Sequence, residues 1–108
     1  MNIIGIIRQE IISNPVLVFM KGSPKQPKCN FSGNAVKALI STNLPFAHVD
    51  ISQSTEIQQA LPKISDWPTF PQIFIGGELV GGSDIVVELN EKGELKPIME
   101  AAINKAAV

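Results

Sequence analysis

Apolar residues at helical spacing open the chain and give way to a short, uninterrupted apolar run. The helical pattern spans residues 3–12, and we expect its isoleucines to share one face: Ile3, Ile4, Ile7, Ile11 and Ile12. Asn14-Pro15 ends this pattern, because the residue before a proline is disfavoured in the helical region. The run Val16–Met20 follows, and it is rich in branched residues. Such a run predicts a strand that is covered on both faces.

A polar loop separates this strand from the next helical pattern. Residues 21–28 (KGSPKQPK) contain two prolines, one glycine and three lysines, a composition typical of a loop. Helical spacing resumes near Cys29 and continues to about Thr42, with Phe31 on its apolar face. Residues 46–51 are largely apolar and predict a second strand.

The second half of the chain begins with a helix and a proline-rich turn. Residues 54–64 predict a helix that Ser54 can cap, and Pro62 predicts an early end or a distortion in it. The segment 67–71 (WPTFP) is a turn that contains two prolines.

A hairpin and two helices complete the chain. Gly76-Gly77-Glu78 separates two short apolar runs, which is a strong hairpin signal. Gly81-Gly82-Ser83-Asp84 introduces a helix that we expect to end at residues 90–93, and residues 95–107 predict the last helix. The two early strands flank a helix and should be parallel, whereas the last two should be antiparallel. The fold class is therefore α/β: a small mixed sheet with helices on both faces.

Length and charge restrict the function classes. The 108 residues suit one domain, which we expect to cover residues 1–108. The formal charge of −1 argues against a broad electrostatic contact with nucleic acid or an anionic membrane. No apolar run approaches the roughly 20 residues that cross a bilayer, and Arg8 and Glu10 interrupt the first segment, so we expect no targeting peptide. We expect a cytoplasmic protein of a reducing compartment.

The single cysteine, Cys29, is the main candidate for chemistry. Free cysteines are commonly buried as small hydrophobic residues, but Cys29 lies where a lysine-rich loop meets the start of a helix. Unpaired N–H groups and the positive end of the helix dipole stabilise a thiolate at that place. Lys21 adds a cation at the carboxyl end of the first strand, where open α/β sheets carry their sites. We therefore expect a reactive or metal-binding thiolate.

Four motifs, in sequence order, carry a resemblance to a known family. They are Lys21-Gly22-Ser23-Pro24, Cys29-Asn30-Phe31-Ser32, Trp67-Pro68-Thr69-Phe70-Pro71-Gln72 and Gly81-Gly82-Ser83-Asp84. From end to end, the chain resembles the bacterial single-domain monothiol glutaredoxins. The resemblance implies a thioredoxin-like fold, which is a four-stranded mixed sheet flanked by about five helices. It also implies a glutathione site and a [2Fe–2S] cluster shared between two subunits.

The resemblance further implies which residues bind glutathione. Pro71 matches the family's cis-proline, which turns the backbone of Phe70 toward the cysteine. A helix start at Gly82–Asp84 can bind a carboxylate, with Asp84 accepting from the α-ammonium group. The family has a basic residue where this chain has Gln58, so we expect weaker glutathione binding. The implied set is Lys21, Gln58, Thr69, Phe70, Pro71, Gly82, Ser83 and Asp84.

The cluster and the partners follow from the same resemblance. A [2Fe–2S] centre usually takes four thiolates, and Cys29 is the one metal ligand of this chain. Two chains and two glutathione thiols would complete the set, which implies a homodimer with the cluster and a monomer without it. Apo iron–sulfur proteins and BolA-type proteins are the implied partners. Asn30 departs from the family's glycine and adds bulk beside Cys29, while His48 is predicted to lie away from the site.

Two functions of different kinds remain, and both use Cys29. We favour a carrier of [2Fe–2S] clusters in iron–sulfur biogenesis and redox homeostasis, with weak oxidoreductase activity at most. The alternative is a glutathione-dependent thiol–disulfide oxidoreductase in which Cys29 is the nucleophile. The carrier is favoured because the chain has no second cysteine and no tyrosine, and because residues 23–27 resemble the loop of carrier-type members. A redox-inert interaction module would instead require a buried, unreactive Cys29.

Overall fold

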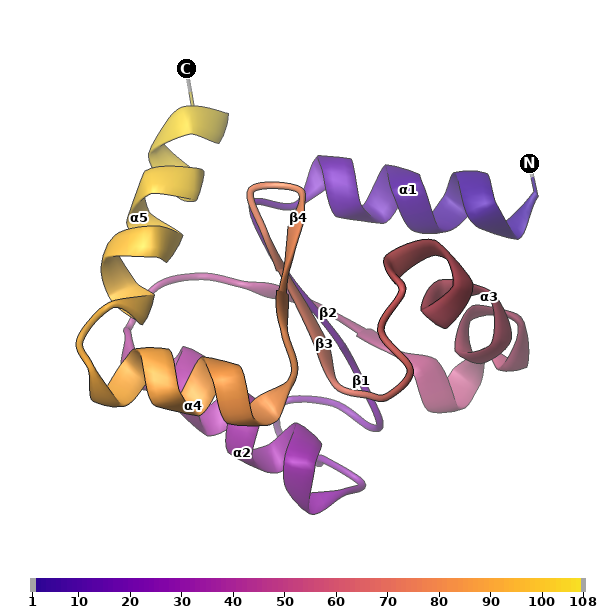
Figure 1. The fold of residues 1–108 in the computed structure, drawn as a ribbon, viewed down its shortest axis with the longest axis horizontal. Coiled ribbons are helices and arrows are strands. Elements are labelled where there is room, and N and C mark those ends of the chain that lie inside the picture. The colour runs from indigo at the N-terminus through magenta and orange to yellow at the C-terminus, as the bar shows by residue number, and fades with distance from the viewer. Residues whose placement is uncertain (1, 108) are drawn as a thin grey trace.

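The sheet lies between two layers of helices in the computed structural model, which describes residues 2–107 (Figure 1). The elements in chain order are α1 (Ile3–Ser13), β1 (Val16–Met20), α2 (Asn30–Ser41), β2 (Ala47–Asp50), the short 3₁₀ helix η1 (Ile51–Gln53), α3 (Thr55–Ser65), β3 (Gln72–Ile75), β4 (Glu78–Gly81), α4 (Ser83–Glu91) and α5 (Leu95–Ala106). The predicted order of helices and strands is confirmed.

The sheet has the strand order β2-β1-β3-β4. β1 pairs with β2 in parallel, and the β1–β3 and β3–β4 pairs are antiparallel, as the order of elements predicted. Every residue of β1 is buried, from Val16 to Met20. Because β1 is central and covered on both faces, an uninterrupted apolar run suits it. Lys21 follows directly at the carboxyl end of this strand.

Two apolar cores fill the spaces between the sheet and its helices. One core lies under α1 and α3, where Phe19 and Phe74 meet edge to face with ring centroids 5.6 Å apart. The other lies under α2, α4 and α5, and it includes Val18, Leu39 and Met99. The two helical layers are on opposite sides of the strands in Figure 1. Both cores therefore fix β1 and β3, whose ends carry the residues of the predicted site.

The predicted apolar faces are only partly buried. In α1, Ile7 and Ile11 are buried, whereas Ile4 and Ile12 are exposed, Ile12 to 78%. A step of one residue turns a helix by about 100°, so Ile12 lies well away from the stripe that Ile11 shares with Ile7. Phe31, at the start of α2, is 61% exposed. The prediction that all five isoleucines share one face was therefore wrong for Ile4 and Ile12, which do not join the buried stripe of Ile7 and Ile11.

Element ends differ from the prediction by a few residues. Pro62 lies inside α3, which continues to Ser65, so the early end was wrong. The buried side chains Ile57 and Leu61 hold this helix against its core, and packing of this kind outweighs local propensity. No helix among residues 2–107 combines the length and the apolar character needed to cross a membrane.

Candidate functional site

Cys29 begins α2, as the sequence predicted. It is the N-cap residue, and its Sγ accepts a hydrogen bond from the backbone N–H of Ser32 at 3.3 Å. The thiol is half-buried rather than enclosed in a core. The requirement of the redox-inert hypothesis, a fully buried cysteine, is therefore not met.

Ser32 connects this thiol to the end of β1. Its Oγ lies 3.2 Å from Cys29 Sγ and accepts the backbone N–H of Lys21 at 3.1 Å, and the side chain is fully buried. Since its oxygen already accepts from Lys21, the hydroxyl proton can point at a Cys29 thiolate. Ser32 stood in the sequence motif, but its apolar surroundings and its contact with β1 appear only in the structure.

The surroundings of Cys29 favour its ionised form. Burial by itself raises the pKa of the thiol, and the Ser32 hydroxyl and Ser32 N–H, the positive charge of Lys21 and the Phe31 N–H oppose it. Together the opposing groups hold the pKa of Cys29 below its ordinary value. The predicted thiolate thus has a specific cause, in which Ser32 contributes more than the lysine.

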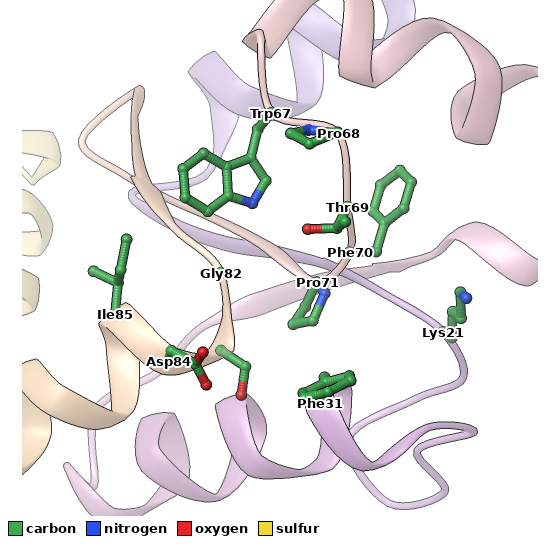
Figure 2. A pocket seen from close by; sticks show the side chains of 11 residues that line it. Lys21, Phe31, Trp67, Pro68, Thr69, Phe70, Pro71, Gly82, Asp84 and Ile85 are labelled. Atoms are coloured by element: carbon green, nitrogen blue, oxygen red, sulfur yellow. The ribbon is translucent and has the colours of Figure 1, made fainter.

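A groove of about 630 Å³ lies beside the first turn of α2. Its wall is formed by the turn between α3 and β3, by the start of α4 and by the end of β1 (Figure 2). The lining residues are Lys21, Phe31, Trp67, Pro68, Thr69, Phe70, Pro71, Gly82, Ser83, Asp84 and Ile85. This volume falls within the usual range for small-molecule sites.

Seven of the eight residues predicted to bind glutathione line this groove, and Gln58 does not. The Gln58 side chain instead donates its Nε2 to the carbonyl of Ile51 at 2.8 Å. Cys29 itself lines a neighbouring hollow of about 300 Å³, together with Asn30. The structure therefore brings most of the predicted glutathione-binding set together in one groove, whereas the thiol lines a separate hollow at the start of α2.

The start of α4 forms one side of the groove. Its N-cap residue, Gly82, provides no side-chain hydrogen bond, so no side chain satisfies the N–H groups of the first turn. A side chain at position 82 would lie 3.3 Å from the carbonyl oxygen of Pro71 and 3.4 Å from Trp67 Nε1. Glycine thus allows the turn and the helix to approach closely, and the helix start favours an anion. The Asp84 carboxylate lies at the same helix start (Figure 2).

The proline-rich turn faces α4 across the groove. Its Phe70–Pro71 peptide bond is cis, as the sequence predicted. Thr69 is exposed, whereas Pro71 is buried where the turn enters β3. In Figure 2, Phe31 rises from α2 toward Pro71, and Lys21 lies on the side of the turn opposite the indole of Trp67.

The loop that precedes Cys29 is an ordered, closed structure. Lys28 N–H donates to the Lys21 carbonyl at 2.8 Å, and Ser23 and Gln26 exchange two backbone hydrogen bonds of 3.2 and 3.1 Å. Gly22 has φ +91°, and a Cβ there would lie 2.4 Å from the carbonyl oxygen of Gln26. Only glycine meets both demands, because other residues are disfavoured at positive φ.

Asp50, at the end of β2, anchors this loop. Its Oδ1 accepts the N–H of Gly22 at 2.9 Å, and the N–H and hydroxyl of Ser52 at 3.0 and 2.6 Å. The pKa of Asp50 is lowered, first by the Ser52 hydroxyl and then by the Gly22 and Ser52 N–H groups and the charge of Lys28. Lys28 Nζ donates to Ser52 Oγ at 3.2 Å. The role of Asp50 could not be predicted from the sequence, because no local pattern connects it with Gly22.

His48 lies on β2 with an exposed side chain, away from the groove lining. Across residues 2–107, no three His, Cys, Asp or Glu side chains gather in a way that could hold a metal ion.

Comparison with known proteins assigns the family. The Glutaredoxin family model matches residues 16–80, which is more than half of the chain. The chain belongs to the glutaredoxin family. Because its 108 residues contain one cysteine, it is a monothiol glutaredoxin.

Curated relatives and solved structures agree with this assignment. Glutaredoxin 4 of Haemophilus ducreyi is 48% identical over 105 residues, covering 97% of this chain and 98% of the relative. Glutaredoxin 4 of Escherichia coli strain K12 is 50% identical over 99 residues, covering 92% and 86%. The solution structure of reduced apo GrxS14 from poplar superposes with a TM-score of 0.79 at 41% identity, covering 92% and 91%.

A further structural neighbour was solved with a ligand. The buckwheat glutaredoxin–glutathione complex matches with a TM-score of 0.79 at 28% identity, covering 91% of this chain and 87% of the buckwheat chain. The thioredoxin-like fold implied by the motifs is therefore confirmed for this glutaredoxin.

Proposed function

We propose that this glutaredoxin binds glutathione in the groove and carries a [2Fe–2S] cluster through Cys29 for delivery to apo iron–sulfur proteins. One observation carries the proposal: the single thiol begins α2, has a lowered pKa and lies two residues before Phe31, which lines a ligand-sized groove. A thiolate is the form of cysteine that binds metal. Redox homeostasis is a secondary role of the same thiol.

The ligand set requires help from outside the chain. A [2Fe–2S] cluster takes four thiolates, and this chain has one cysteine. Two chains and two glutathione thiols supply the four. The cluster-bound form is then a homodimer and the cluster-free form a monomer. A BolA-type protein could replace one subunit by supplying its own ligand.

The groove has groups that match each polar part of glutathione. Lys21 is an exposed cation at one end and suits a carboxylate. The uncapped start of α4 suits the second carboxylate, and Asp84 can accept from the α-ammonium group. The backbone of Phe70, beside Pro71, can pair with the extended peptide. Binding at this edge would bring the glutathione thiol next to Cys29, and the glutathione complex of the buckwheat relative supports this assignment.

Anaerobic reconstitution tests the carrier function. The protein is incubated with ferrous iron, sulfide and glutathione, and visible absorption, iron and sulfide content and molecular mass in solution are measured. We expect a coloured dimer that becomes a colourless monomer when the cluster is lost. A colourless monomer under all conditions would refute the proposal.

Two variants make this experiment specific. Cys29→Ser should abolish cluster binding while preserving the start of α2, because serine is a favourable N-cap residue. If this variant still bound iron and sulfide, Cys29 would not be the ligand. Asn30→Gly removes the side chain next to Cys29 in the smaller hollow, and a longer cluster lifetime in this variant would identify Asn30 as the hindrance.

The lowered pKa of Cys29 also favours a second function, thiol–disulfide exchange. The Cys29 thiolate attacks the glutathione sulfur of a mixed disulfide, the target thiolate leaves and takes a proton, and Cys29 becomes glutathionylated. A second glutathione thiolate then attacks this disulfide, releases oxidised glutathione and restores Cys29. Turnover of a glutathionylated peptide measures this activity. Fast turnover would make the oxidoreductase, rather than the carrier, the main function.

A further inference from the structure

Among residues 2–107, Gln72 is the one fully buried residue whose polar side chain bonds to the turn of residues 67–71. It is the first residue of β3 and has 0% exposure. Its Nε2 donates to the carbonyl of Trp67 at 2.9 Å and to the carbonyl of Thr69 at 3.2 Å. One amide group therefore uses both of its N–H donors to connect the beginning and the middle of the turn.

The turn itself lacks other bonds of this kind. Pro68 and Pro71 have no N–H group, and no backbone–backbone hydrogen bond involves residues 67–71 in the described structure. The indole Nε1 of Trp67 is buried without a partner within residues 2–107. The Trp67 backbone N–H makes only a long contact, 3.3 Å, with Ser65 Oγ. The Gln72 amide is thus the main hydrogen-bonding support of the turn.

Gln72 is itself held by a rigid element. In the sheet it is the partner of Phe19 on β1, the central strand. Burying an amide costs free energy unless its polar atoms are paired, and Gln72 Oε1 has no partner in the described structure. An apolar side chain would avoid that cost at this position but would leave the two turn carbonyls without their donor.

We propose that Gln72 is a positioning residue for glutathione binding: it holds the turn Trp67–Pro71 in the shape that presents Thr69 and Phe70 to the ligand. The proposal rests on the proposed glutathione site. It makes a separate claim, however, about what determines the shape of the turn.

The test uses variants that keep the length of the side chain. Gln72→Met removes both donors, and Gln72→Glu keeps the shape with at most one donor. Gln59→Met is the matched control, because Gln59 is an exposed glutamine of α3 away from the groove lining. Three quantities are measured: glutathione affinity by calorimetry, the pH profile of Cys29 alkylation by iodoacetamide, and quenching of tryptophan fluorescence by acrylamide.

Trp67 is the one tryptophan of the chain, so its fluorescence reports on the turn directly. We expect Gln72→Met to weaken glutathione binding about tenfold, roughly the value of one or two hydrogen bonds, and Gln72→Glu to weaken it less. Quenching should increase in both variants, while the alkylation profile stays within about twofold of wild type. General destabilisation would instead change the alkylation profile as well.

Three outcomes contradict the proposal in distinguishable ways. Unchanged quenching in Gln72→Glu and Gln72→Met would show that Gln72 does not hold the turn. Increased quenching with unchanged glutathione affinity would show that the turn does not present the ligand. If the wild-type protein itself bound no glutathione, the proposed function would fail, whereas the quenching result would still decide what shapes the turn. Should Gln72→Met not fold, Gln72→Glu decides alone.

Discussion

Two segments flank the candidate site, and they keep their shapes by different means. The loop of residues 22–28 closes on itself through backbone hydrogen bonds and is anchored by the Asp50 carboxylate near the surface. The turn of residues 67–71 has no backbone closure and depends on the buried amide of Gln72. Both contain two prolines, but the five-residue turn has fewer remaining N–H groups with which to bond itself.

This difference determines which substitutions should disturb the shape of each segment. A self-bonded loop tolerates changes of exposed side chains and is sensitive to its backbone conformation, above all at Gly22. The externally supported turn is instead expected to be sensitive to one side chain in the neighbouring strand, that of Gln72. Variants that separate backbone from side-chain effects therefore test the comparison.

The largest effect is expected for Gly22→Ala. The positive φ and the approach of a Cβ to the Gln26 carbonyl oxygen, 2.4 Å, should together lower the free energy of unfolding by about 3 kcal/mol. Gly77→Ala is the control, since Gly77 also has positive φ but has nothing within 4 Å of the added Cβ. It should cost about 1 kcal/mol. Urea unfolding measures both, and equal losses would mean that the loop is not tightly closed.

Ser32→Ala tests whether the Ser32 hydroxyl, which lies between the Lys21 N–H and Cys29 Sγ, stabilises the thiolate. Removing the hydroxyl raises the pKa of Cys29 toward its ordinary value, because one of the groups that stabilise the thiolate is lost. The alkylation rate at pH 7 should fall about fivefold, the value of one hydrogen bond. Ser41→Ala, at the other end of α2, should leave the rate unchanged. An unaltered pH profile in Ser32→Ala would assign the thiolate to Lys21 and the helix start alone.

Asp50→Asn should have a smaller effect, which depends on pH. The folded-state pKa of Asp50 lies below its ordinary value of 3.8, so the unfolded chain binds more protons near that pH. The stability that the carboxylate adds is therefore present above about pH 4 and is lost as the pH falls through the lower, folded-state pKa. Because the carboxylate is near solvent, we expect less than about 1 kcal/mol. Thermal unfolding of both proteins at pH 7 and pH 3 should show a smaller difference between them at pH 3 than at pH 7.

The smallest effects concern the ends of the groove. Lys21→Ala should weaken glutathione binding about threefold at low salt and less at high salt, as expected for an exposed ion pair. Gln58→Ala should change the affinity by less than about twofold, because the Gln58 amide bonds to Ile51 rather than lining the groove. Titrations at two salt concentrations compare them. A larger effect of Gln58→Ala would restore the role that the family resemblance implied.

The sequence predicted the elements well because their signals are local. The apolar run of β1, the glycine pair of the hairpin and Pro15 after α1 each act on neighbouring residues, and the order of elements then restricted the topology. The exceptions, Ile4, Ile12 and Pro62, arise where packing decides which side of a helix is covered and how far a helix continues.

Most of the residues of the candidate site were also predicted from the sequence. Cys29 could be assigned to a helix start, and the motifs collected seven residues that line one groove. Gln58 could not be judged, because its bond to Ile51 depends on how η1 and α3 meet. Asp50 and Gln72 were missed as supports, since each acts on carbonyl or N–H groups that only the folded chain brings within reach.

The sequence by itself determined the chemistry of this protein: one thiol, at a helix start, next to cations and glycines. A single cysteine can neither form a disulfide within the chain nor supply all four thiolates of a [2Fe–2S] cluster, whatever the fold. The tertiary structure decided what lowers the pKa of that thiol and what holds the segments beside it. Ser32 from α2 lowers the pKa, Asp50 from β2 anchors the loop of residues 22–28, and Gln72 from β3 bonds to the turn of residues 67–71. Hydrogen bonds between distant segments depend on distances of about 3 Å, and such distances are set by the packing of the sheet and its helices.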